Sequence, residues 1–95
     1  MSNPQKSLEI LVEKPGPEKL KNLGVEKWPT WTSEVKTFDW EYDSEETCYF
    51  LEGRVKVKPP GGEVAIEKGE LAVFPKGLRC TWQVLEPVRK VYRFA

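Results

Sequence analysis

The chain has 95 residues, of which 39% are apolar, and its 15 Lys and Arg residues balance 15 Asp and Glu residues. This length suffices for one hydrophobic core and is too short for two, so we expect a single domain over residues 1–95. The balanced charge gives no basis for a nucleic-acid partner, and no apolar run approaches the roughly 20 residues of a membrane-spanning helix. The composition therefore predicts a globular fold with neither a nucleic-acid nor a membrane partner.

The sequence contains no histidine and only two cysteines, Cys48 and Cys80. The missing histidine excludes Ser-His-Asp and Cys-His catalysis and every zinc or iron site that needs a histidine ligand. We expect Cys80 to be a buried, inert thiol, and the alternative is a nucleophile activated by Arg79 or Lys76. Cys48 shares a strand face with Glu46 and Phe50, and a disulfide between the two cysteines is disfavoured. The start of the chain has no apolar leader, so we expect a cytoplasmic or other reducing compartment; an organellar transit peptide that had been removed would leave no trace here.

The first part of the chain, residues 1–32, predicts one short strand and one short helix. Residues 7–13 are β-prone, and the prolines that follow cannot continue a ladder. Residues 18–23 carry leucines at helical spacing behind Pro17, and Gly24 stands where such a helix ends. We expect the strand to pair with a second copy of the chain in a homodimer, with a monomer as the alternative.

Residues 27–32 combine two tryptophans with a proline. A proline restricts the residue before it and removes a backbone donor, so we expect an irregular stretch here. Trp28 and Trp31 either cover the core or a pocket in it, or contact a second subunit. The sequence does not separate these alternatives.

The rest of the chain has a β pattern almost without interruption. Aromatic residues alternate in residues 34–42, which indicates a half-buried strand. Gly53, Gly69 and Gly77 stand at tight turns that favour a positive φ. Further strands are expected over residues 46–51, 54–58, 64–67, 71–74, 80–85 and 88–94. With the first strand this makes about eight short strands, a pattern typical of an all-β sandwich or barrel.

The turn residues also stand at definite spacings. Six residues separate Glu46 from Gly53, and a second set follows the next hairpin: Gly69, Pro75, Gly77 and Cys80. The first spacing resembles the end of the first cupin motif, and the second resembles the second cupin motif. Over residues 33–94 the chain resembles the small single-domain cupins of unknown function related to the cupin domains of ureidoglycine aminohydrolase and ethanolamine-utilisation protein Q. The resemblance implies a double-stranded β-helix, the jelly-roll barrel of cupins, with one short N-terminal helix.

The metal ligands that this resemblance implies are largely missing. In metal-binding cupins, two histidines precede the glutamate of the first motif and another follows the glycine of the second. These places hold Trp40, Tyr42 and Cys80 here, and only Glu46 is kept. A tryptophan has no lone pair for a metal, so we expect neither a metal nor another cofactor. The resemblance would otherwise imply metal-dependent dioxygenase, isomerase or aminohydrolase reactions. We do not expect these reactions without a metal.

A pocket is still expected inside the barrel. If the strands alternate as predicted, five side chains point into it: Trp40, Tyr42, Glu46, Cys80 and Trp82. Aromatic faces stack on flat groups and a carboxylate binds hydroxyls, amides or amines, so we expect a small polar or ring-bearing metabolite. Two alternatives are a cofactor-independent or weakly metal-dependent enzyme for a nitrogen or carbohydrate metabolite, and a dimer-forming structural protein whose barrel is plugged.

Glu46 is the residue on which the enzyme alternative depends. An inward-facing carboxylate must be paired, solvated or neutralised, and the candidate partners are Tyr42, Arg79 and Lys36. Without a cation nearby, burial favours the protonated carboxyl, and Glu46 becomes a candidate general acid or base with Tyr42 as a proton donor. The enzyme alternative therefore predicts that Glu46 has no basic partner.

Overall fold

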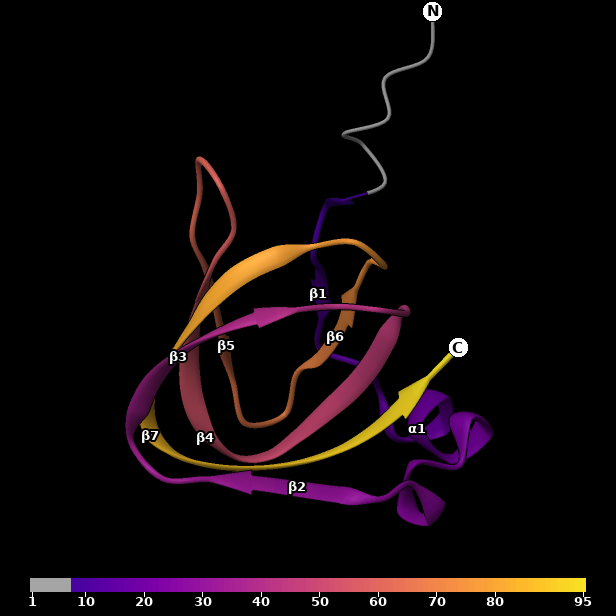
Figure 1. Cartoon of the computed structure of the whole chain (residues 1–95). Coiled ribbons are helices and arrows are strands. Elements are labelled where there is room, and N and C mark those ends of the chain that lie inside the picture. Colours follow the sequence, from indigo (N-terminus) through magenta and orange to yellow (C-terminus); the bar gives the residue numbers. More distant parts are fainter. Residues whose placement is uncertain (1–7) are drawn as a thin grey trace, which may run out of the picture.

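Seven antiparallel strands curl into one barrel-shaped sheet in residues 8–95, the part of the chain that this computed structural model describes (Figure 1). The strands are β1 (Leu11–Glu13), β2 (Thr30–Ser33), β3 (Lys36–Glu41), β4 (Glu46–Lys58), β5 (Val64–Glu67), β6 (Leu71–Phe74) and β7 (Arg79–Phe94). One α-helix, α1 (Pro17–Leu23), and one 3₁₀ turn, η2 (Val25–Lys27), complete the fold. The expected jelly-roll barrel with one short N-terminal helix is confirmed.

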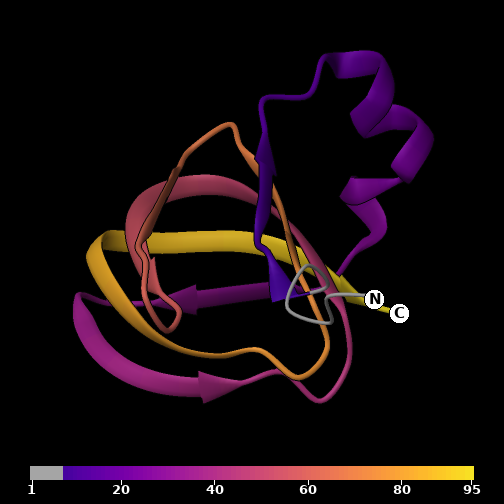
Figure 2. The same ribbon diagram turned by 90° about the horizontal axis from the view of Figure 1, so that it is seen from above.

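The two longest strands, β4 and β7, form the spine of the barrel. The sheet runs in the order β1-β6-β4-β7-β2, with β3 added to β7 and β5 added to β4. Both long strands curve around the barrel in Figure 1, and Figure 2 shows α1 outside the barrel wall. No side chain of α1 is buried. The helix therefore contributes no buried side chain to the interior of the barrel.

Strand β4 corrects the expectation of two separate strands over residues 46–51 and 54–58. The strand continues through Gly53, and its register against β7 shifts between Phe50 and Val55. Gly53 has a φ of 95°, and a Cβ on it would overlap the carbonyl oxygen of Pro87. Such a bulge bends a strand without ending it, so Gly53 lies at a bend within one ladder and not at a turn between two strands.

Strand β7 likewise joins the two strands expected over residues 80–85 and 88–94. Pro87 lies opposite the bulge, and the paired positions pass from Glu86 to Arg89 across it. A proline that has no ladder donor to supply is tolerated at a bulge. The seven observed strands differ from the eight expected ones because two pairs fuse and one strand, β2, was not expected.

Strand β2 replaces the irregular stretch predicted for residues 27–32. Thr30 to Ser33 pair with Val91 to Val88 of β7 in antiparallel register. Pro29 stops the ladder from beginning earlier, but the threonines and Trp31 after it suit a pleated surface. The expectation gave too much weight to the proline and too little to these residues.

The N-terminal elements agree with the expected helix and place the first strand within the barrel. Helix α1 ends at Gly24, which adopts the left-handed conformation with a φ of 71°. Strand β1 pairs with β6 of the same chain and lies at the end of the strand order. Residue 7 of the expected strand lies outside the described residues, and the homodimer stays a prediction. In residues 8–95 no helix is long and apolar enough to cross a membrane.

The core lies inside the barrel and is rich in aromatic and β-branched residues. Positive φ values of 95° at Gly53 and 90° at Gly69 and Gly77 confirm the predicted turn conformations. Inward-facing side chains of β4, β5, β6 and β7 supply most of the core, whose largest fully buried members are Tyr42, Phe50, Phe74, Ile66, Val55, Val57 and Val84. The packed part of the barrel leaves room at one end, where the candidate site lies.

Candidate functional site

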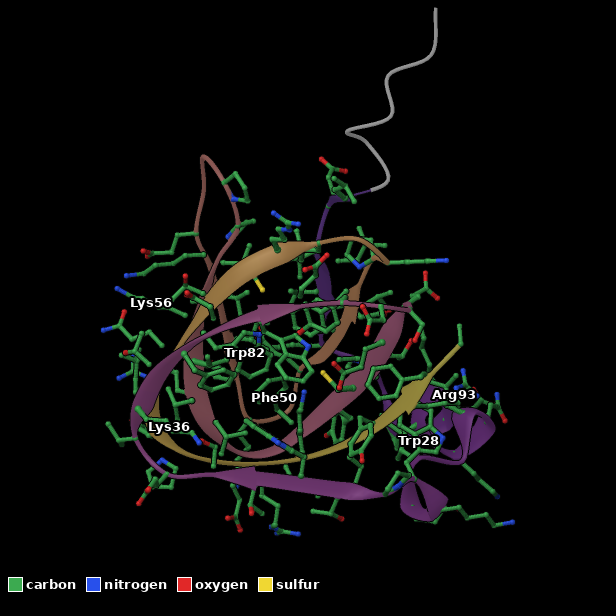
Figure 3. All side chains as sticks on the ribbon, viewed as in Figure 1. Trp28, Lys36, Phe50, Lys56, Trp82 and Arg93 are labelled. Carbon is green, nitrogen blue, oxygen red and sulfur yellow. The ribbon has the colours of Figure 1, made fainter. Side chains whose placement is uncertain are left out.

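A cavity of about 220 Å³ opens between β2, β3, β4 and β7. Two charged residues line it, Glu46 and Lys90, and the rest of its lining is aromatic: Trp31, Phe38, Trp40, Tyr42, Trp82, Tyr92 and Phe94. Figure 3 shows Trp82 inside the ring of strands. The volume lies below the roughly 300–1,000 Å³ typical of pockets for drug-sized ligands. The cavity therefore suits a molecule smaller than a drug.

Four of the five side chains predicted to line a pocket do line this cavity. Tyr42, Glu46 and Trp82 are buried at its floor, whereas Trp40 is 49% exposed and forms part of its wall. Cys80 pairs with Trp40 across β3 and β7 and is buried, but it does not line this cavity. Strand alternation correctly indicated the interior face, and the barrel's curvature decides which interior positions meet the cavity.

Glu46 and Lys90 form a buried ion pair. Glu46 begins β4, opposite Phe74 of β6 and Phe94 of β7. Lys90 Nζ donates a hydrogen bond of 2.9 Å to Glu46 Oε2, and the two side chains are only 5–6% exposed. The pair satisfies the requirement that a buried charge be compensated. It also places one donor group and one acceptor group together at the floor of the cavity.

This contact corrects the prediction of the glutamate's partner. Neither predicted cation pairs with Glu46: Arg79 contacts Glu41 at 3.5 Å, and Lys36 Nζ lies 5.4 Å from the ring centroid of Phe38. Both lie on or beside outer positions of the β3–β7 ladder, whereas Lys90 extends from the other half of β7 into the barrel. Because a cation does reach Glu46, the condition for a free general acid or base is not met.

Lys90 is the functional candidate that the sequence analysis missed. Along the second half of β7, Val88, Lys90, Tyr92 and Phe94 stand at alternate positions, and the other three are apolar or aromatic. Strand alternation puts all four on one face. A lysine within an otherwise apolar set was the signal that could have identified it.

Aromatic rings surround the ammonium group of Lys90. Its Nζ lies 4.6 Å from the ring centroid of Trp82, 5.0 Å from that of Trp31 and 5.9 Å from that of Phe74. Ring faces attract cations within about 6 Å, so these contacts stabilise the lysine inside the barrel. Trp31 therefore packs on the core and lines the cavity, while the ring of Trp28 lies 4.9 Å from the Arg93 guanidinium beside η2 (Figure 3).

Tyr42 is fixed at the cavity floor by the turn of the second motif. Its backbone N–H donates to the Leu78 carbonyl at 2.9 Å, and the Gly77 N–H donates to the Tyr42 carbonyl at 2.7 Å. Trp82 Nε1 donates to the Tyr42 hydroxyl at 3.2 Å. Burial first, and then the charge of Glu46, raise the pKa of Tyr42 far above its ordinary value. The residue is a neutral phenol at physiological pH and a poor proton donor.

The two cysteines are buried free thiols, which is the state expected for Cys80. Burial raises the pKa of Cys48 to about 12 against the lowering effect of Lys90. Burial likewise raises the pKa of Cys80 to about 11. Because the thiolate is the nucleophile, neither side chain is activated for covalent chemistry.

The residues at the four metal-ligand positions of cupins do not fit a metal ion. Trp40 has no lone pair to offer, Tyr42 is a neutral phenol that accepts a hydrogen bond from Trp82, and Glu46 is bonded to Lys90. The fourth position, Cys80, does not line the cavity. Within residues 8–95, no cluster of three or more His, Cys, Asp or Glu side chains is arranged to hold a metal. The positive charge next to Glu46 comes from Lys90.

The barrel and its two motif turns define a cupin, and comparisons with known proteins specify which kind. The family model of the EutQ-like cupin domain matches residues 20–92. The chain therefore belongs to the EutQ-like cupin family. This supports the ethanolamine-utilisation side of the expected resemblance and does not single out ureidoglycine aminohydrolase.

Solved structures agree with this assignment. The chain is 61% identical to a DUF861 family protein from Thermotoga maritima, with a TM-score of 0.91, over 92% of this chain and 100% of that one. The EutQ protein of Clostridium difficile is 28% identical, with a TM-score of 0.62, over 66% of this chain and 50% of that one. The ethanolamine utilization protein Q of Salmonella typhimurium is 24% identical, with a TM-score of 0.62, over 66% and 51%.

Two limits of these similarities bear on function. The chain spans about half the length of the two ethanolamine-utilisation proteins. No curated protein matches the chain. The comparisons therefore establish the family and the fold, and the function must be argued from the cavity.

Proposed function

We propose that the protein binds a small polar or ring-bearing metabolite in the aromatic cavity around Glu46 and Lys90. The observation that carries this proposal is an open cavity of about 220 Å³ whose aromatic walls end on a buried ion pair. Apolar walls with a few polar groups at fixed positions are typical of small-molecule sites. Burying an ion pair costs free energy that a purely structural core avoids.

Each part of the lining has a role in this proposal. Trp40, half exposed, provides a ring against which a flat ligand stacks on entry, and Trp82 provides a buried ring beside the ion pair. The ion pair orients the polar edge of the ligand, because hydrogen bonds to charged groups are among the stronger ones. The rigid barrel holds these groups without a conformational change on binding.

The two other candidate functions are less well supported. A plugged structural barrel requires that the aromatic side chains fill the interior, and the cavity speaks against this. An enzyme that acts through Glu46 and Tyr42 requires a free carboxylate and an available proton, whereas Glu46 is bonded to Lys90 and the pKa of Tyr42 is strongly raised by burial. Turnover of a bound compound that Glu46→Gln abolishes would favour the enzyme.

A ligand screen tests the proposal. Small ring-bearing and polar metabolites are added singly to the protein, and binding is read both as an increase in melting temperature and as a shift of the tryptophan indole N–H signals in NMR spectra. Trp40→Ala should weaken binding of a hit by about 2- to 10-fold, since a stacked aromatic pair contributes about 0.5–1.5 kcal/mol.

Trp28→Ala is the matched control, because Trp28 is an aromatic residue outside the cavity lining. It should leave the affinity unchanged. Equal losses in the two variants would place the bound compound elsewhere, and a screen without any hit would contradict the proposed function.

A further inference from the structure

The floor of the cavity presents two hydrogen-bonding functions of opposite kind side by side. The Lys90 ammonium carries three N–H donors, and the described residues supply one acceptor for it, Glu46 Oε2 at 2.9 Å. Lys90 lines the cavity, and its Nζ lies 4.6 Å from the ring centroid of Trp82 and 5.0 Å from that of Trp31, so its remaining donors face ring surfaces and the space in which a ligand would sit. An acceptor on the ligand is needed to satisfy them.

Glu46 supplies the complementary function. Its Oε2 accepts from Lys90, and Oε1 takes part in none of the hydrogen bonds among the described residues. In residues 8–95 every fully buried side-chain N and O atom has a partner, so Oε1 keeps contact with accessible space. Since Glu46 lines the cavity, that space is the cavity. A donor on the ligand is needed here.

The charge of the floor selects the ligand further. An anion placed on Lys90 also meets the Glu46 carboxylate, 2.9 Å from Nζ, and a cation placed on Glu46 also meets the ammonium group. A neutral group with an acceptor beside a donor satisfies both sides without an unpaired charge. The aromatic walls favour a flat ring, and they disfavour a zwitterion because desolvating its two charges is costly.

We propose that the ligand is a flat, uncharged ring whose edge carries a carbonyl next to an N–H, with the carbonyl accepting from Lys90 and the N–H donating to Glu46 Oε1. This inference rests on the proposed binding function and specifies the chemical class of its ligand. The cavity volume of about 220 Å³ limits the ligand to one ring or a small fused ring.

The inference is tested with two fragments that differ at this edge alone. 2-Pyridone carries the adjacent carbonyl and N–H, and 1-methyl-2-pyridone lacks the N–H. Dissociation constants are measured by NMR titration, with the indole N–H signals as the readout. 2-Pyridone should bind at least about tenfold more tightly, because the methylated ring loses the hydrogen bond to a carboxylate. β-Alanine serves as the zwitterionic probe.

Variants then assign this preference to the ion pair. In Glu46→Met/Lys90→Met both charges are removed together, so no unpaired charge is left buried. In this variant the two pyridones should bind with about the same affinity. It should persist in Glu52→Gln/Arg89→Gln, which removes an exposed ion pair between the same two strands.

The outcomes separate this inference from the function on which it rests. Three results would overturn the proposed ligand class and leave small-molecule binding in place. The two pyridones could bind with equal affinity, β-alanine could bind more tightly than 2-pyridone, or the preference for 2-pyridone could persist without the ion pair. Failure of both pyridones and of every compound in the general screen would overturn both.

Discussion

Two of the ion pairs between β4 and β7, Glu46–Lys90 and Glu52–Arg89, are alike in length and opposite in environment. The Glu46–Lys90 distance is 2.9 Å, and the Glu52–Arg89 distance is 3.0 Å. The side chains of the first pair are 5–6% exposed, and those of the second are 45% and 59% exposed. Adjacent positions of β7, Arg89 and Lys90, thus supply one cation to the outer face of the barrel and one to its interior.

The comparison shows why one pair is a site candidate and the other is not. Water solvates the charges of Glu52 and Arg89, so their mutual contact contributes little to folding. The buried pair loses its hydration, and its partners and the surrounding rings must replace it. This cost of burying the pair beside an open cavity is one reason why we propose that its polar groups bind a ligand.

The largest expected effect comes from removing one member of the buried pair. Lys90→Met keeps a long unbranched side chain and leaves the Glu46 carboxylate buried without its cation. We expect the free energy of unfolding to fall by about 3–5 kcal/mol. Arg89→Met, the matched control one residue away, should cost less than about 1 kcal/mol. Urea unfolding of both variants measures the difference, and equal losses would contradict the assignment of the two environments.

Removing both members of the buried pair should restore most of this stability. Glu46→Met/Lys90→Met replaces both charges by apolar side chains of similar length, and such replacements are often neutral or stabilising. We expect a free energy of unfolding within about 1 kcal/mol of that of the unsubstituted protein, or higher. A double-mutant cycle should then give a coupling energy of several kcal/mol for the buried pair and a much smaller one for the solvent-exposed pair of Glu52 and Arg89.

The polar contact beside the buried pair should have a smaller effect. Tyr42→Phe removes the hydroxyl that accepts from Trp82 Nε1 and leaves a buried indole N–H without its partner. The expected loss is about 1–3 kcal/mol, together with a changed chemical shift of the Trp82 indole proton. Tyr92→Phe, in a partly exposed ring on the same cavity, is the control and should cost less. An unchanged indole signal in Tyr42→Phe would contradict the hydrogen bond.

The smallest expected effects concern pH, and they distinguish the barrel's two faces. The hydrogen bond and charge of Arg89 lower the pKa of Glu52, so this pair contributes stability above the ordinary carboxyl value of 4.5 and loses it as the pH falls through the folded-state pKa. Burial raises the pKa of Cys48 from 9.0 to about 12, so its contribution is complete below pH 9 and is lost as the pH rises toward 12.

The free energy of unfolding, measured from pH 4 to pH 10, checks the direction of both pH effects. Arg89→Met should reduce the loss of stability at acid pH, and Cys48→Ala should reduce the loss of stability at alkaline pH. Between pH 8 and pH 9.5 the alkaline change from Cys48 should stay below about 1 kcal/mol. An alkaline slope that Cys48→Ala does not alter would argue that the thiol contributes nothing there.

The sequence predicted the fold better than its individual strands. The spacing of Glu46 and Gly53 and the turn residues of the second motif indicated the cupin barrel. Gly53, Gly69 and Gly77 adopt the predicted positive φ values, Gly53 at a bulge and not at a turn. The strand boundaries were wrong at Gly53 and at Pro87, because a glycine or proline ends a strand or bends it depending on what lies opposite. Here each lies opposite the other in one bulge.

In the candidate site, too, the sequence predicted some features and only the folded barrel decided others. Alternation along residues 34–42 and 80–85 indicated that Tyr42 and Trp82 face the interior, a local property of any strand. Lys90 shared an interior face with apolar residues in the sequence, but its contact with Glu46, 44 positions away, depends on how β7 curves around the barrel. Cys80 has the predicted burial and not the predicted place in the cavity for the same reason.

By itself the sequence determined the β architecture, the turn conformations, the loss of histidine chemistry and the aromatic character of the interior, because these follow from residue types and short spacings. Only the tertiary structure decided that Glu46 meets a lysine, that the cavity stays open, and that one of two neighbouring cations is buried while the other is solvated. These properties depend on distances between strands far apart in the chain, and the closing of the barrel sets those distances.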